Sequence, residues 1–211
     1  MFAFVRRLLA LPLVLIFALL PAASMAMPID PALYQVWRAT WFVSGPNFSC
    51  TATAIDKNAD VTFFITASHC AASDLQVFLP GTKISAKADV VANGGGDDQD
   101  WAVLSAPVQA PAVIPLDRTD DAYIGEPIVT SGFPWGVGPI VTTGIISGQP
   151  YISEVKNSML AVYVFGAPGA SGSAIVARDT QKVVGILVSG LSDESGPWLI
   201  LAVPATRVQW P

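Results

Sequence analysis

The sequence predicts an all-β fold built as a sandwich or a barrel, and three observations support this. From Val36 onward, the 211-residue chain consists of short runs rich in β-branched, aromatic and aliphatic residues. Gly, Pro, Asn and Asp separate these runs at close intervals and favour turns. Helical periodicity is almost absent after Val36, so many short strands are left to form the core.

The composition fits one compact unit or two small lobes that share an interface. With 52% hydrophobic and 13% charged residues, the chain has ample material for a core and does not have the composition of a disordered protein. The net charge is -5 and the sequence contains no run of Lys or Arg. We therefore expect no nucleic acid among its partners.

The first 26 residues have the parts of an export signal. Arg6 and Arg7 precede an apolar run over residues 8–20, and Ser24-Met25-Ala26 supplies the small residues that a signal peptidase requires. Cleavage after Ala26 predicts an exported chain, periplasmic or secreted, that has no further contact with the membrane. An uncleaved membrane anchor is the alternative, because the apolar stretch approaches the roughly 20 residues of a span.

Export would place Cys50 and Cys70 in an oxidising compartment, where they should pair. Closing a loop of this size stabilises a fold by about 3 kcal/mol in the chain-entropy model. Zinc is the rival interpretation, but the two cysteines and His69 lack a further ligand and show no zinc-type spacing. We expect neither a metal nor a cofactor.

Taken in order, the elements begin with one short helical turn over residues 30–35. Asp30 can cap this turn and Pro31 suits its first position. Strands are then expected at 37–43, 49–55, 61–66, 75–79, 84–92 and 101–105 and, after a proline-rich joint at 107–115, at 127–132, 141–147, 160–165, 173–177, 183–189 and 198–203. The joint predicts an N-terminal lobe at 27–115 and a C-terminal lobe at 116–211.

The chain has a single histidine, His69, at the end of the hydrophobic run Phe63-Phe64-Ile65-Thr66. A partly buried histidine at a strand end is the structural alternative to a catalytic role. The neighbouring Cys70, if it forms a disulfide, would fix the backbone of His69. A general base needs such a fixed position.

One of three clustered aspartates is placed to act on an imidazole. Asp100 is followed directly by Trp101-Ala102-Val103-Leu104, so its carboxylate should lie at the mouth of a buried strand. Asp97 and Asp98 are expected to face water and to have no chemical role.

A serine lies between glycines in Gly169-Ala170-Ser171-Gly172-Ser173. Glycines permit a tight turn in which the N–H groups of Gly169 and Ser171 point to one spot, where they could bind an oxyanion. A plain glycine-rich turn is the alternative. With His69 and Asp100, however, Ser171 would complete the set that activates a hydroxyl nucleophile.

These residues carry a resemblance to a known family. Thr66-Ala67-Ser68-His69-Cys70 resembles the Thr-Ala-Ala-His-Cys motif of trypsin-like serine peptidases, and the chain order of His69, Asp100 and Ser171 is theirs. The segments that begin at Asp100 and Gly169 are similar to those around their acid and nucleophile. Gly132-Phe133-Pro134-Trp135-Gly136 and the ending Ala202-Val203-Pro204-Ala205 resemble the bacterial HtrA-like branch.

The resemblance implies a chymotrypsin-like fold of two packed six-stranded antiparallel β-barrels with the active site between them. His69 as base and Asp100 as its orienting acid would come from the first lobe. Ser171, the nucleophile, would come from the second lobe, with an oxyanion hole formed by the N–H groups of Gly169 and Ser171. The implied reaction is hydrolysis of protein or peptide substrates, and the Cys50–Cys70 disulfide would brace the histidine loop.

The resemblance also places a substrate pocket with Phe165 at its base and Val188, Ser189 and Gly190, with Trp198-Leu199, along its wall. Such a pocket predicts small or medium apolar side chains at the cleaved residue. Ala170, Ser173 and Ala174 depart from the family pattern, so a catalytically silent binding module is an alternative, and an esterase is a minor one. The sequence ends at Pro211, so no PDZ domain is expected.

Overall fold

The computed structural model describes residues 29–96, 99–119, 121–149, 159–193 and 196–210. The proposed export signal at 1–26, and Asp97 and Asp98, lie outside the described residues. The side chain of Trp198, expected at the pocket wall, does so too. Within the described residues, no helix is long and apolar enough to cross a membrane.

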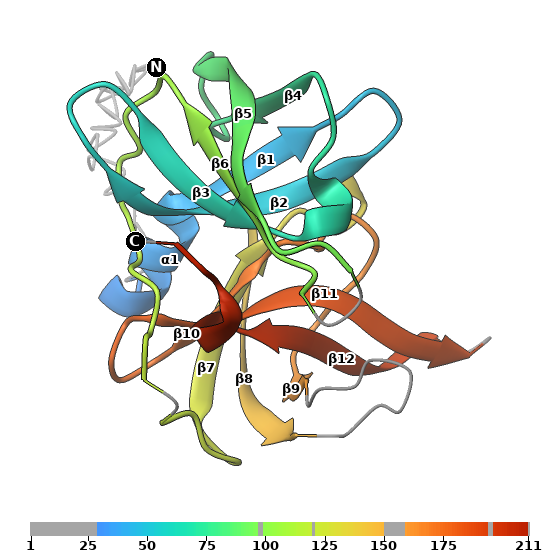
Figure 1. The fold of residues 1–211 in the computed structure, drawn as a ribbon. Coiled ribbons are helices and arrows are strands. Elements are labelled where there is room, and N and C mark those ends of the chain that lie inside the picture. The colour runs from blue at the N-terminus through green and yellow to red at the C-terminus, as the bar shows by residue number, and fades with distance from the viewer. Residues whose placement is uncertain (1–28, 97–98, 120, 150–158, 194–195, 211) are drawn as a thin grey trace, which may run out of the picture.

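Twelve strands of the described chain close into two antiparallel barrels, drawn one above the other in Figure 1. The N-terminal barrel closes in the order β1-β2-β3-β6-β5-β4, and the C-terminal barrel in the order β10-β11-β12-β9-β8-β7. Each strand contains part of one of the twelve stretches that the sequence predicts. The expected fold, two packed six-stranded barrels, is therefore confirmed.

The strand bounds are as follows. The N-terminal barrel contains β1 Thr40–Ser44, β2 Ser49–Lys57, β3 Thr62–Thr66, β4 Leu75–Phe78, β5 Ser85–Asn93 and β6 Ala102–Ala106. The C-terminal barrel contains β7 Pro127–Gly132, β8 Ile140–Gly148, β9 Leu160–Tyr163, β10 Ala174–Ala177, β11 Val183–Asp193 and β12 Gly196–Pro204. Short 3₁₀ turns are η1 Ser68–Cys70, η2 Pro134–Gly136 and η4 Ala205–Arg207.

Aromatic and aliphatic side chains fill the barrels and the space between them. In the N-terminal barrel, Trp41 and Phe64 are fully buried and meet edge to face, with ring centroids 5.2 Å apart. Ala52 of β2 and Ala174 of β10 belong to one continuous hydrophobic cluster. The two barrels thus share a core, which holds loops from both sides in a fixed relation.

The N-terminal helix is longer than the sequence predicts. Helix α1 runs over Pro31–Ala39, and Asp30 caps it by accepting a hydrogen bond from Ala32 N at 2.9 Å. The strand expected from Trp37 therefore begins only at Thr40, which is a correction. Val36 and Ala39, one turn apart, are both buried, so packing selects a helix for residues whose types also suit a strand.

The first and the last described segments each pack against the opposite barrel. Helix α1 contacts β7 and β8, and Asp30 pairs with Arg178 of the C-terminal half at 2.7 Å. The C-terminal tail returns to the N-terminal barrel, where Trp210 packs on Phe63 with ring centroids 4.8 Å apart. The predicted lobe boundary at 115/116 falls in the connection between β6 and β7.

Candidate active site

His69 and Asp100 lie next to the ends of two adjacent strands of the N-terminal barrel. His69 is in turn η1, just after β3, and Asp100 lies two residues before the start of β6, which pairs with β3. The His69 Nδ1 is 2.8 Å from Asp100 Oδ2, and the backbone N–H of His69 donates to Asp100 Oδ1 at 2.9 Å. One carboxylate thus holds both the ring and the backbone of the histidine.

This arrangement sets the protonation of the imidazole. A carboxylate can only accept, so Nδ1 carries a proton and Nε2 is left as the basic nitrogen. The hydrogen bond to Asp100 raises the pKa of His69 above its usual value, and the carboxylate charge adds to this, while partial burial of the ring opposes it. The Asp100 side chain is 17% exposed and that of His69 is 47% exposed, so the ring reaches solvent and its acid is shielded.

A disulfide braces the turn that carries His69. Cys50 in β2 and Cys70 in η1 are joined, with their Cα atoms 6.2 Å apart, and both residues are buried. The bond ties η1 to a barrel strand at the residue next to His69. The backbone of the histidine is therefore fixed on one side by the disulfide and on the other by the Asp100 carboxylate.

Ser171 lies in a hydrogen-bonded turn of the C-terminal barrel. Ala170 N donates to Ala167 O at 2.9 Å, and Ser173 N donates to Ala170 O at 3.0 Å. Gly169 and Gly172 have φ of +94° and +87°, which an L side chain rarely adopts. The turn is closed although Ala170 and Ser173 depart from the family pattern.

The N–H groups of Gly169 and Ser171 donate to no acceptor within the described part of the chain. Pro168 O and the Gly169 N–H belong to the same peptide group and point in opposite directions. Pro168 O accepts a hydrogen bond from Trp135 N at 2.6 Å. Because a peptide is planar and trans, fixing this carbonyl also fixes the direction of the Gly169 N–H. The turn thus leaves two backbone N–H groups without a protein acceptor among the described residues, and the direction of one of them, that of Gly169, is fixed.

The two halves of the site meet through backbone contacts. Thr51 N, beside Cys50, donates to Ser171 O at 2.9 Å, and Cys70 Sγ lies 3.9 Å from the same oxygen. These contacts bring the backbone of Ser171 against the turn that carries His69. The structure thus joins the predicted acid and base directly, and it brings the backbone of the predicted nucleophile against the turn that carries the base.

A cavity of about 340 Å³ opens beside Ser171 and is walled mainly by apolar groups. Of the predicted pocket residues, Phe165, Ser189 and Gly190 line it. Val188 does not, and this is a correction: it lies where the pairing of β11 with β12 shifts register between Leu187 and Ser189, and its side chain is buried in the hydrophobic core. Its neighbour Leu187 lines the cavity instead.

Two further lining residues, Trp135 and Ile200, were not predicted from the sequence. Trp135 is 67% exposed, has φ of +52°, and its ring centroid lies 5.7 Å from that of Phe165. The position of Trp135 between Pro134 and Gly136 is a turn signal that could have drawn attention to it. Among the residues that the structure describes, no charged one lines this cavity.

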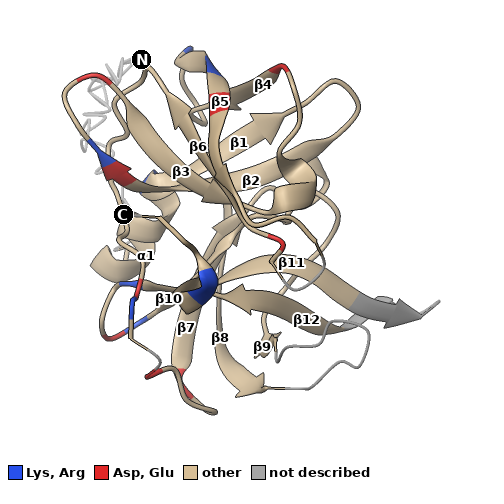
Figure 2. Cartoon of the chain, viewed as in Figure 1, with Lys and Arg blue, Asp and Glu red and all other residues tan. Residues whose placement is uncertain are grey.

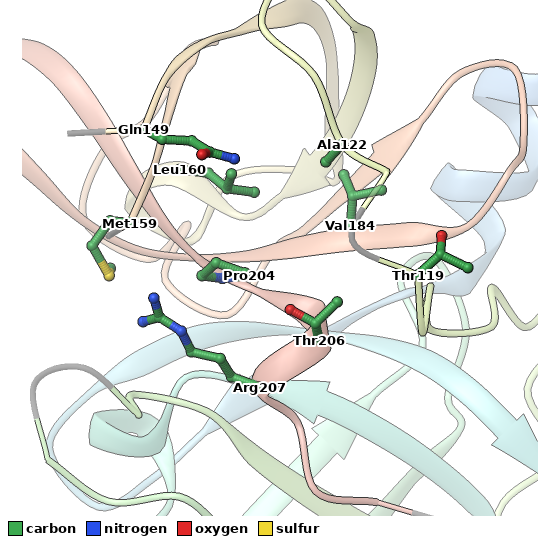
Figure 3. Close-up of a pocket in the computed structure, with 9 residues that line it drawn as sticks. All are labelled: Thr119, Ala122, Gln149, Met159, Leu160, Val184, Pro204, Thr206 and Arg207. Carbon is green, nitrogen blue, oxygen red and sulfur yellow. The ribbon is translucent and has the colours of Figure 1, made fainter. Parts of the chain in front are cut away.

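A second cavity, of about 190 Å³, shares no residue with the first (Figure 3). Its lining combines residues of strands and loops with Thr206 and Arg207 of η4, and Figure 3 shows Arg207 reaching toward Pro204 and Met159. The described residues of this lining include no His, Cys, Asp or Glu, and so offer none of the bases used most in hydrolysis. We therefore place the candidate active site at Ser171.

The paired six-stranded barrels define a chymotrypsin-like fold. The chain belongs to the trypsin-like peptidase domain family, whose sequence model matches residues 50–186. That stretch includes His69, Asp100, Ser171 and both cysteines.

Solved structures share this fold. HtrA-type protease AlgW with a decapeptide has a TM-score of 0.68 at 21% identity, covering 82% of this chain and 62% of that one. AlgW with a tripeptide has a TM-score of 0.70 at 24% identity, covering 82% and 58%. The inactive form of a serine-to-alanine mutant of Rv3671c from M. tuberculosis has a TM-score of 0.64 at 16% identity, covering 84% and 86%.

The chain spans about three fifths of the length of these AlgW structures. No protein of curated function matches its sequence.

Proposed function

We propose that the protein is an exported serine endopeptidase that cleaves peptide bonds with Ser171 as nucleophile, His69 as general base and Asp100 as orienting acid. The observation that carries the proposal is the two-point hold of Asp100 on His69, at 2.8 Å to the ring and 2.9 Å to the backbone. A structural histidine at a strand end needs no carboxylate behind its Nδ1. A histidine that must accept a proton at Nε2 benefits from one, because the carboxylate stabilises the imidazolium that forms.

In the proposed reaction, His69 Nε2 takes the proton of the Ser171 hydroxyl as the oxygen attacks the scissile carbonyl. The oxyanion that forms accepts hydrogen bonds from the N–H groups of Gly169 and Ser171, and such donors contribute a few kcal/mol each to the transition state. His69 then returns the proton to the leaving amine. Water repeats the sequence on the acyl-enzyme and releases the second product.

The proposed substrate is a peptide with an apolar side chain at the cleaved residue. The cavity beside Ser171 has Phe165, Trp135 and Ile200 in its wall, and its described lining residues include no charged group, so they can bury an apolar side chain but offer no partner to Lys or Arg. Figure 2 shows Lys and Arg positions scattered over both barrels.

Export to the periplasm or the medium is part of the proposal. The signal-like segment at 1–26 and the Cys50–Cys70 disulfide support it.

Labelling with a fluorophosphonate probe tests the proposal. The protein is expected to gain one probe adduct at Ser171, seen by intact mass and peptide mapping. Ser171→Ala is expected to gain none, and His69→Ala is expected to react far more slowly, because a serine without its base is a poor nucleophile. A folded protein that never labels, or labels equally in all three forms, refutes the peptidase and favours the silent binding module.

Phe165→Ala is expected to change substrate preference more than overall activity. Phe165 is 50% exposed and lines the cavity, so its removal deepens the pocket without opening the core. The ratio of kcat/KM for a Phe substrate over a Val substrate is expected to rise roughly tenfold. Matched peptides that differ only at the cleaved residue provide the measurement. An unchanged ratio would show that Phe165 does not contact that side chain.

A further inference from the structure

Thr51 connects the N-terminal barrel to the oxyanion loop, defined here as residues 167–171. It lies in β2 beside Cys50 and is fully buried. Its hydroxyl donates to Gly169 O at 2.9 Å and accepts from Phe133 N at 3.0 Å. Its backbone N–H donates to Ser171 O at 2.9 Å. One residue of the first lobe thus holds two carbonyls of the loop that belongs to the second.

Thr51 is also joined to the strand that leads to His69. Thr66, the last residue of β3, donates its hydroxyl to Thr51 O at 2.7 Å. The polar groups of Thr51 are therefore all hydrogen-bonded, with partners on both sides of the candidate site. This degree of pairing in a buried position gives Thr51 little freedom to move.

The position of Gly169 explains why its loop needs an external hold. Glycine has the widest choice of backbone conformations, and Gly169 uses one with φ of +94°. The Thr51 hydroxyl fixes the carbonyl of Gly169, in the peptide after its Cα. Trp135 N fixes the carbonyl of Pro168, in the peptide before the Cα of Gly169. Because each peptide is planar, these two bonds together define the φ and ψ of Gly169.

We propose that Thr51 is a positioning residue of the peptidase, whose hydroxyl keeps the Gly169 N–H aimed at the oxyanion. This inference rests on the proposed function, since it assigns a role within the same site. Thr51 itself touches neither the substrate nor the reacting atoms. Its contribution is to hold in place, before the reaction, a donor that is used in the transition state.

Thr53 provides a matched control. It lies two residues further along β2, so its side chain points to the same face of the strand as the side chain of Thr51. Thr53 is 1% exposed, and its hydroxyl also bridges the barrels, accepting from Ala174 N at 3.3 Å. Ala174 is in β10 and not in the oxyanion loop. Thr53→Val therefore removes a buried inter-barrel hydrogen bond without releasing Gly169.

The experiment compares Thr51→Val, Thr51→Ser and Thr53→Val with the unmodified protein. Steady-state hydrolysis of a peptide gives kcat and KM, and amide hydrogen exchange followed by mass spectrometry reports on the peptide that spans residues 166–173. Thr51→Val is expected to lower kcat roughly 10- to 100-fold, with KM changed less than about threefold, and to speed exchange in that peptide. Thr51→Ser, which keeps the hydroxyl, and Thr53→Val are expected to retain kcat within about threefold.

Three results would overturn the inference: an unchanged kcat in Thr51→Val, an equal loss in Thr53→Val, or a loss of kcat without faster exchange. If Thr51→Val does not fold, Thr51→Ala takes its place, because it also lacks the hydroxyl and adds no bulk. An unmodified protein that neither hydrolyses peptides nor labels at Ser171 refutes the proposed function, and the role of Thr51 with it. An active protein in which Thr51→Val matches the control refutes only the role of Thr51.

Discussion

Replacing Asp100 with asparagine is expected to lower the kcat of peptide hydrolysis roughly 10⁴-fold at neutral pH. In the structure, both carboxylate oxygens accept from His69, one from the ring Nδ1 and one from the backbone N–H. An asparagine has one acceptor oxygen and one amide donor, so it can satisfy only one of these bonds. If the oxygen stays with the backbone, the amide faces Nδ1 and forces the ring proton onto Nε2. His69 then presents no base to Ser171.

Asp100→Asn is also expected to change the pH dependence of kcat/KM. Asp100 raises the pKa of His69 above its usual value near 6.5, and the base must be neutral to accept a proton. In the unmodified protein, kcat/KM is therefore expected to rise with pH through this raised pKa. Asp100→Asn is expected to lower the pKa of His69.

The His69–Asp100 pair also affects the stability of the fold. Its contribution is fully present at pH below 6.5 and is lost as the pH rises through the raised pKa of His69.

His69 is the only histidine, so one imidazole signal in an NMR titration reports its pKa without assignment by mutation. The titration of unmodified protein and Asp100→Asn, with pH–rate profiles of both, checks the prediction. Asp100→Glu is the control, because it keeps the charge at a changed distance. Equal pKa values in the unmodified protein and Asp100→Asn, or an undiminished kcat, would show that Asp100 does not orient the base.

Gly172→Ala is expected to cost about 2 to 5 kcal/mol of folding free energy, or to prevent folding. Gly172 has φ of +87°, and a Cβ there would overlap Thr51 O and Thr66 Oγ1. These two atoms are hydrogen-bonded to each other at 2.7 Å, so neither can retreat without straining that bond. Urea denaturation followed by fluorescence gives the change in free energy.

Gly81→Ala separates backbone strain from lack of space. Gly81 also has positive φ, at +69°, but no atom lies within 4 Å of the position its Cβ would take. Its substitution is expected to cost about 1 kcal/mol, the strain alone. Equal costs at the two positions would show that the close approach of Gly172 to the N-terminal barrel does not decide its identity.

The sequence predicted the features that depend on neighbouring residues. Short runs of β-branched, aromatic and aliphatic residues, separated by turn residues, located all twelve strands, because both signals are local in the sequence. Asp100 was separated from Asp97 and Asp98 by the apolar run after it, and the structure places its carboxylate against His69. The two cysteines were paired from the predicted export alone.

Features that depend on distant residues were missed. Thr51 contacts residues more than 80 positions away in the sequence, and no local pattern announces such partners. Trp135 and Ile200 meet in one cavity although they lie on different elements. Val188 was misplaced because the pairing of β11 with β12 shifts register at this residue, and its side chain lies in the core. The Trp37 segment was misassigned because burial of Val36 and Ala39 against the C-terminal barrel overrides strand preference.

Incubation of a mixed peptide library with unmodified protein and with Ser171→Ala, followed by mass spectrometry of the products, tests the peptidase most directly. The unmodified protein is expected to yield new termini that cluster after apolar residues, and Ser171→Ala is expected to yield none above background. Identical product sets from the two folded proteins, or no cleavage by either, would contradict a peptidase that acts through Ser171.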